Sequence, residues 1–193
     1  MNGLADPLWD LLASLAETVD DTLIAAGAAV CRMYIAPGES ATWDVCCECD
    51  VDHEGQAWVA VQRYYPVRAF PSPDGPLRCR PEAYAADLAV GVLRCASTVD
   101  EGGDPPSGQT LTLEAAKVSR DRTLLHDAVL CQWPADLLPG GLQLRGWRPL
   151  GPQGGCVGGL LEISVAVDAC DCLPEPEPLS GFGLTPFGEV FGG

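Results

Sequence analysis

Residues 145–172 constrain the fold of this chain more than any other part of its sequence. They combine a strand-like segment with basic and aromatic residues, a glycine-rich bend and a run of alternating aliphatic side chains. The alternating side chains are Leu161, Ile163, Val165 and Val167. A period of two is the period of a β-strand that buries one face. The segment therefore predicts two paired strands joined by an unusual bend.

The bend contains five glycines within nine positions: Gly151, Gly154, Gly155, Gly158 and Gly159. So many glycines weaken a strand pair unless some of them provide left-handed backbone or allow a close approach of another segment. We therefore predict that Gly154, Gly155 and Gly158 are structural. A phosphate-binding loop would end in Lys-Ser/Thr and open a helix, whereas Cys156 leads into a strand without a basic residue. The bend is interpreted as a bulged hairpin.

The composition indicates one domain with an appendage. The chain has 193 residues, 47% of them hydrophobic, which is enough for one core. Its 27 acidic and 11 basic side chains give a formal net charge of −16, which argues against a protein that grips DNA, because cations drive that binding. No apolar run reaches membrane-spanning length. Asp6 and Asp10 lie where a secretion signal needs positive charge, so we expect a cytoplasmic product.

Two helices are predicted. The first has Asp6 as its N-cap and Pro7 at its first position, and Gly27 ends it. Its apolar stripe consists of Leu8, Leu11, Leu12, Leu15, Val19 and Leu23. The second helix, over about residues 112–132, has a broad apolar face that Asp121 interrupts. That face consists of Val118, Leu124, Leu125, Ala128, Val129 and Cys131.

The remaining pattern predicts a sheet. A short strand is expected within residues 28–35, and a hairpin is expected between residues 43–51 and 57–65 across the polar segment DHEG. Five prolines in residues 66–81 predict an extended loop that stays outside the core. Another strand is expected from about Asp87 onward.

The predicted fold class is α+β, with a mixed and mainly antiparallel sheet, two helices packed on one face, and an extended loop. The segment EGGDPPSG is a linker that leads to the second helix. Residues 1–172 form the domain, and residues 173–193 form an extended C-terminal arm rich in Pro, Gly and Phe. The arm either stays disordered or docks on a partner through its aromatic residues. These are Phe182, Phe187 and Phe191.

Ten cysteines are distributed over every segment of the chain. They are Cys31, Cys46, Cys47, Cys49, Cys79, Cys95, Cys131, Cys156, Cys170 and Cys172. We expect most of them to be small core residues or late-forming bridges. The best zinc set would be Cys46 and Cys49 with Cys170 and Cys172, or with His53. The segment around Cys46 has a strand-like pattern, in which neighbouring side chains point to opposite faces, so no metal site is expected.

No catalytic residue is expected either. A cysteine hydrolase needs a thiolate beside a histidine and an orienting Asn or Asp. The chain has only two histidines, and Asn2 is its only asparagine. His53 falls in a predicted turn, and His126 lies beside Asp127 on the second helix, where a solvated or capped surface histidine is favoured over a base. We therefore expect neither an enzyme nor a cofactor.

Several motifs, taken in order, resemble those of small neck proteins of long-tailed phages of actinobacteria, in particular tail terminators. The motifs are TWDVCC, WVAVQRYYP with a following FP, VGVLRCA, HDAVLC and WRPLGPQGGCVGG. The resemblance covers roughly residues 28–168, and PLGPQGGCVGG with the upstream WDVCC is its most specific part. It implies a mixed sheet with helices on one side, and a hexameric ring that ends the tail tube and joins it to the head connector.

This resemblance implies a location in the virion neck and a definite set of partners. These are further copies of the chain, the major tail tube protein and the head-side connector or stopper protein, with no membrane. DNA would be passing cargo only, so we expect an acidic or neutral channel. Candidate channel residues are Asp50, Asp52, Glu101 and Asp104. Subunit contacts are expected at Arg78, Arg80, Arg145 and Arg148 and at the phenylalanines of the arm. The alternative is a cysteine-rich adaptor outside a virion, stabilised by metal or disulfides.

Overall fold

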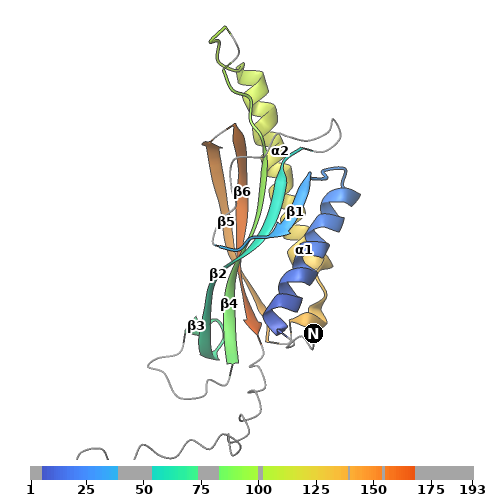
Figure 1. The fold of residues 1–193 in the computed structure, drawn as a ribbon, viewed down its shortest axis with the longest axis vertical. Helices are drawn as coiled ribbons and strands as arrows, with labels where there is room; N and C mark the ends of the chain where they lie inside the picture. Colours follow the sequence, from blue (N-terminus) through green and yellow to red (C-terminus); the bar gives the residue numbers. More distant parts are fainter. Residues whose placement is uncertain are drawn as a thin grey trace, which may run out of the picture.

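The computed structural model describes residues 6–38, 54–73, 83–99, 102–138, 140–153 and 155–167, and every structural statement below refers to these residues. They form one mixed sheet with two helices on one of its faces (Figure 1). The predicted α+β fold class is therefore confirmed. Within the described ranges, no helix is long and apolar enough to cross a membrane.

Helix α1 (Pro7–Ala25) begins and ends where local sequence signals predict. The side chain of Asp6 accepts hydrogen bonds from the backbone N–H groups of Leu8 and Trp9, as an N-cap does. Gly27 follows the helix with a φ of +64°, in the left-handed region that favours glycine. The buried stripe of the helix consists of Leu11, Leu12, Leu15, Val19 and Leu23.

The sheet has the strand order β1-β2-β4-β6-β5, and β3 pairs with β2 off this path. The strands are β1 (Arg32–Ile35), β2 (Gln56–Ala69), β3 (Ser72–Pro73), β4 (Ala83–Cys95), β5 (Leu142–Gln153) and β6 (Cys156–Val167). β1 runs parallel to β2, and all other pairs are antiparallel. The predicted pair of strands around the glycine-rich bend is thus the β5–β6 hairpin at one side of the sheet (Figure 1).

Helix α2 (Gly108–Asp127) begins four residues earlier than predicted, because Ser107 caps it and accepts a 3.1 Å hydrogen bond from the backbone N–H of Thr110. A π-helical turn (Ala128–Gln132) and a 3₁₀ turn (Ala135–Leu137) follow. The apolar face predicted for this helix is only partly correct. Leu125, Ala128 and Val129 are buried, whereas Cys131 is exposed.

The main core lies between the helices and one face of the sheet. The predicted alternating residues of β6, from Leu161 to Val167, are all buried there beside the leucines of α1. A smaller apolar cluster lies around Trp58, together with Ala36, Ala60, Leu93 and Cys156. The indole ring of Trp58 covers Gly91, where an added Cβ would lie 2.1 Å from the ring.

The extended loop predicted for residues 66–81 is wrong at its start. β2 continues through Pro66 to Ala69 and turns back into β3, and Val67 is buried. The prolines of this segment predicted a loop where the chain forms a strand. Pro66 lies in the part of β2 beyond the four residues that pair with β1, and a strand tolerates a residue without a backbone N–H at such an edge position. The strand expected from Asp87 begins at Ala83. The predicted hairpin strand 43–51 lies outside the described residues.

Candidate functional site

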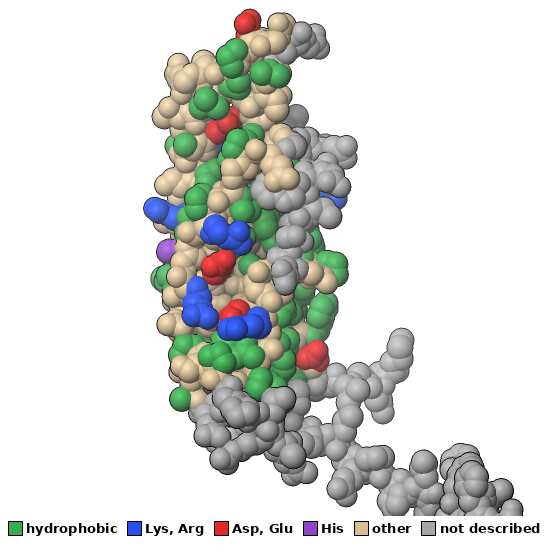
Figure 2. Space-filling view, turned by 90° about the vertical axis from the view of Figure 1, so that its left-hand side faces the viewer, with side chains coloured by type: hydrophobic (Ala, Val, Ile, Leu, Met, Phe, Trp, Pro, Cys, Tyr) green, Lys and Arg blue, Asp and Glu red, His purple; other side chains and the backbone are tan. Residues whose placement is uncertain are grey.

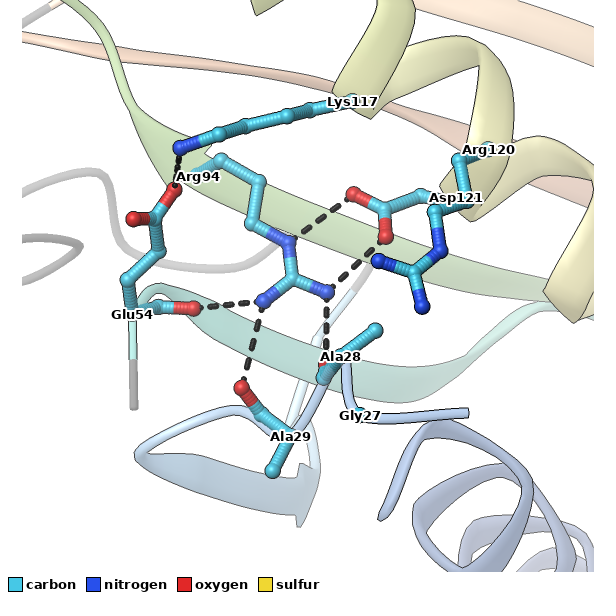
Figure 3. A pocket seen from close by; sticks show the side chains of 8 residues that line it. All are labelled: Gly27, Ala28, Ala29, Glu54, Arg94, Lys117, Arg120 and Asp121. Carbon is cyan, nitrogen blue, oxygen red and sulfur yellow. Dashed lines mark hydrogen bonds and ion pairs between the residues drawn. The ribbon is translucent and has the colours of Figure 1, made fainter. Parts of the chain in front are cut away.

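A polar pocket of about 180 Å³ lies where α1, α2, β2 and β4 meet (Figure 3). Arg94, near the end of β4, points into it and forms a salt bridge with Asp121 of α2 at 2.9 Å. Both side chains are almost completely enclosed, with 6% and 3% of their surface exposed. Asp121 is the residue that interrupts the predicted apolar face of the second helix, and its partner explains the interruption.

All five N–H donors of the Arg94 guanidinium are used within the protein. Two bond to the carboxylate of Asp121, at 2.9 Å each. The others bond to the backbone carbonyls of Ala28 at 2.8 Å, Glu54 at 2.7 Å and Ala29 at 3.3 Å. Because a guanidinium has five donors and no acceptor, none remains for a ligand. This residue ties the α1–β1 connection, the start of β2, β4 and α2 together, so the pocket is structural.

The charged side chains at the rim of the pocket also have partners. Lys117 forms a 2.8 Å ion pair with Glu54, and Arg120 donates to the backbone carbonyl of Ala26. The described residues of the pocket contain no nucleophile beside a base.

A second group of charges lies on the face of the sheet opposite the helices, around Asp87 of β4. Its carboxylate accepts hydrogen bonds from Ser164 at 2.5 Å and Tyr65 at 3.1 Å, and pairs with Arg63 at 3.1 Å and Arg145 at 3.5 Å. Burial alone would raise the pKa of Asp87. The hydrogen bonds from Ser164 and Tyr65 and the charges of Arg145 and Arg63 outweigh burial and lower this pKa below its ordinary value.

The predicted contact residues Arg145 and Arg148 both lie on β5 and belong to this charged face. Arg148 pairs with Glu162 at 3.3 Å, and both arginine side chains are exposed to solvent. Figure 2 shows basic and acidic side chains gathered halfway along this side of the molecule. The other predicted contacts lie outside the described residues: Arg78, Arg80, Phe182, Phe187 and Phe191. Of the candidate channel residues, only Asp104 is described, and it is exposed.

Two of the three glycines predicted to be structural are described. Gly155 has a φ of +77°, which is strained for other residues, although an added Cβ would meet only Thr98, at 3.9 Å. Gly158 is constrained differently, because an added Cβ would lie 2.0 Å from the backbone oxygen of Val92. Gly154 lies outside the described residues. The bend leads directly into β6, as the hairpin interpretation requires.

His126 differs from the surface histidine expected from the sequence. It is partly buried, and its Nε2 atom is enclosed without a hydrogen-bond partner among the described residues. Sequence reasoning missed this because the packing around the end of α2 depends on segments far apart in the chain.

Cys31, Cys95 and Cys156 are each disulfide-bonded, and Cys131 is a free, exposed thiol. No group of three metal-binding side chains occurs in the described part of the chain. All cysteines of the candidate zinc set lie outside that part, and so does His53. The zinc hypothesis therefore stays open at those positions.

The most unusual surface is the first half of α2, residues 108–120, which we call the projecting helix. It extends beyond the end of the sheet (Figure 1), and none of its side chains is buried. Two large apolar side chains of this helix are exposed, Leu111 at 50% and Leu113 at 60%, and Val99, in the segment between β4 and α2, is 62% exposed. Figure 2 shows hydrophobic side chains at this end of the molecule. Sequence reasoning missed this surface, although the absence of a continuous apolar stripe before Val118 indicates it.

No protein-family description matches the chain, and a search of curated proteins finds no significant match.

Proposed function

We propose that this chain is a structural protein of a phage neck, a tail terminator, whose copies form a ring that ends the tail tube and joins it to the head connector. The ordered motifs from TWDVCC to WRPLGPQGGCVGG suggest the family. The α+β plan agrees with that resemblance but is shared by many unrelated proteins, so it adds little by itself.

The observation that supports assembly most strongly is the projecting helix. An isolated helix shorter than about 12–15 residues is marginal in water, and most helices in proteins are stabilised by packing of an apolar face. Among the described residues, no side chain of the projecting helix is buried, and only the second half of α2 carries buried residues. The first turns of this helix are supported by the Ser107 cap and by a 2.6 Å hydrogen bond from the backbone N–H of Ser97 to Glu114. Farther along, Lys117 pairs with Glu54 and Arg120 donates to the carbonyl of Ala26, so the contacts with the rest of the fold are polar. A neighbouring subunit would supply the missing contacts.

The arrangement of the apolar side chains indicates how a neighbour would be contacted. Leu111 and Leu113 are two positions apart, so they lie on nearly opposite sides of the helix. A helix with apolar residues on two sides is suited to insertion between other elements rather than to lying on a flat surface. The contact would be heterologous, because the projecting end of one copy meets a different surface of the next. Such contacts form a ring when the rotation from copy to copy closes on itself.

The charge of the chain supports a channel through which DNA passes without being held. A net charge of −16 per copy repels phosphates on average. The three arginines of the charged sheet face, Arg63, Arg145 and Arg148, are already paired with carboxylates of the same face. Few cations remain to retain a duplex by counterion release.

Size measurement and imaging of the purified full-length protein test this proposal. Native mass spectrometry and negative-stain electron microscopy should show one closed ring, of about 120 kDa if six copies of 20.3 kDa assemble. The double substitution Leu111→Glu with Leu113→Glu should give folded monomers. Leu137→Glu, at another exposed leucine away from the projecting helix, should leave the ring intact. A wild-type chain that stays monomeric at all concentrations would refute the proposal.

The disulfide-bonded cysteines favour one second candidate, an adaptor outside a virion that is stabilised by disulfides. It would share the fold but not the ring. Immunogold labelling of purified phage particles from the source separates the two, because only a neck protein is located where the tail meets the head.

A further inference from the structure

The outer edge of β5 is the longest unpaired strand edge in the described part of the sheet. Among the described strands, β5 is the last in the order and pairs only with β6. It lies at the side of the sheet in Figure 1, and many of its residues are exposed. Its first seven residues, 142–148, contain no proline. An edge of this length offers a row of backbone donors and acceptors to any extended segment that reaches it.

The C-terminal arm contains a segment with the right chemistry for such an edge. Residues 173–179 read LPEPEPL, with proline at every second position. In a β-strand, successive N–H groups point to opposite edges, so the three missing donors all fall on one edge. The N–H groups of the other residues all point to the opposite edge. Each residue before a proline is also held in the extended region. This segment can pair along one edge only.

The charges of the two segments are complementary. Glu175 and Glu177 are two positions apart, so in a strand both side chains project from the same face. Arg145 and Arg148 pair with Asp87 and Glu162 on the same face, and 40% and 57% of their side chains stay exposed, so both guanidinium groups can also meet carboxylates of an added strand. Opposite charges on neighbouring strands stabilise their pairing.

The lengths agree as well. Seven residues of strand span about 23 Å, which is the length of the proline-free part of β5. The end of β6 lies beside the start of β5, because Leu142 pairs with Val165. Five residues, 168–172, connect β6 to the segment and span at most about 17 Å. β6 therefore ends, at Val167, at the end of the sheet where the β5 edge begins.

We propose that residues 173–179 of one copy add a strand to the outer edge of β5 in the neighbouring copy, with Glu175 and Glu177 facing Arg145 and Arg148. This inference rests on the proposed ring, because the ring brings a neighbour's arm to the edge. The proline-bearing edge of the added strand then faces outward. It has no donors for a further strand, so the sheet ends there and assembly stops at the ring.

Photo-crosslinking of the full-length protein tests the pairing. Benzoylphenylalanine replaces Gln143, an exposed residue of β5, and unlabelled and ¹⁵N-labelled copies are mixed before assembly. We expect crosslinked peptides that join residue 143 of one isotope to residues 173–179 of the other. The same group at Gln109, an exposed residue of α2, is the matched control and should give at least tenfold fewer such products.

Charge reversal provides a second measurement. Glu175→Lys with Glu177→Lys should lower the crosslink yield at least tenfold, and adding Arg148→Glu should recover at least threefold. Glu189→Lys, farther along the arm, should leave the yield unchanged. Replacement of Pro174, Pro176 and Pro178 by Ala should restore the outer donors, so that sedimentation shows species larger than the ring.

Each outcome separates the strand pairing from the ring itself. Crosslinks that join peptides of one isotope only would overturn the assignment to a neighbour. Rings without crosslinks to residues 173–179 would overturn the strand pairing and leave the proposed function standing. A monomer in the same samples would refute the ring, and the pairing between copies with it.

Discussion

The buried Arg94–Asp121 pair provides the most direct test of what holds this fold together. Asp121→Ala removes the acceptor of two of the five donors of Arg94 and leaves a guanidinium charge that is 6% exposed without a counter-ion. Removing one partner of a buried ion pair costs about 3–5 kcal/mol. A domain of ordinary stability unfolds with about 5–15 kcal/mol, so the substitution should remove a large part of the total.

Urea denaturation followed by far-ultraviolet circular dichroism, without reducing agent, measures this free energy. The variants to compare are Asp121→Ala, Arg94→Met and the combination of both. Because the two residues are in contact, their effects should not add, and the double-mutant cycle should give a coupling energy of about 2 kcal/mol or more. Lys117→Met is the matched control, since its ion pair with Glu54 lies at the same pocket but is exposed and is worth about 0–1 kcal/mol.

A loss below about 1 kcal/mol for Asp121→Ala would refute the reasoning, because it would mean that water satisfies the guanidinium as well as the carboxylate does. A loss of equal size for Lys117→Met would show that the pocket stabilises the fold through its rim. Rings of the Asp121→Ala variant, if they form, should dissociate at lower urea than wild-type rings, since α2 carries the projecting helix.

Four further predictions concern other parts of the chain. Gly158→Ala should cost about 2 kcal/mol or more in urea denaturation, because its Cβ would lie 2.0 Å from the backbone oxygen of Val92. The stabilisation from Asp87 should be complete above the pKa of Asp87 in the unfolded chain, and it should be lost as the pH falls through the lowered pKa in the folded protein. Asp87→Asn should therefore make the free energy of unfolding depend less on pH between about 2 and 5. Cys131 should react with iodoacetamide in the native protein, and Cys31 should react only after reduction, as peptide mapping would show. A titration with duplex DNA at low salt should show no tight binding.

Controls and contrary results are available for each of these. Gly151→Ala should be tolerated, because no atom of the described residues lies within 4 Å of its added Cβ. An Asp87→Asn variant with the acid sensitivity of the wild type would show that other carboxylates govern it. Labelling of Cys31 before reduction would contradict its disulfide. DNA affinity that falls steeply with rising salt would show that the protein binds DNA through its phosphates, against this prediction.

Local sequence signals determined the elements that need no distant partner. The cap at Asp6, the leucine stripe and Gly27 define α1, because each signal acts within a few residues. The period of two in β6 defined its buried face, and the glycines before it indicated a hairpin, since both strands lie next to each other in sequence.

Tertiary structure alone decided the partners of residues that are far apart in the chain. Asp121 interrupts an apolar face in the sequence, and only the fold brings Arg94 and the carbonyls of Ala28 and Glu54 to it. Likewise, Pro66 is typical of a loop in the sequence, and only the pairing of β2 with β4 shows that it belongs to a strand. Tertiary structure also decides that the projecting helix is exposed, because whether a helix is covered depends on where the sheet ends. Sequence patterns report the face and period of an element, whereas its neighbours are set by the packing of the whole chain.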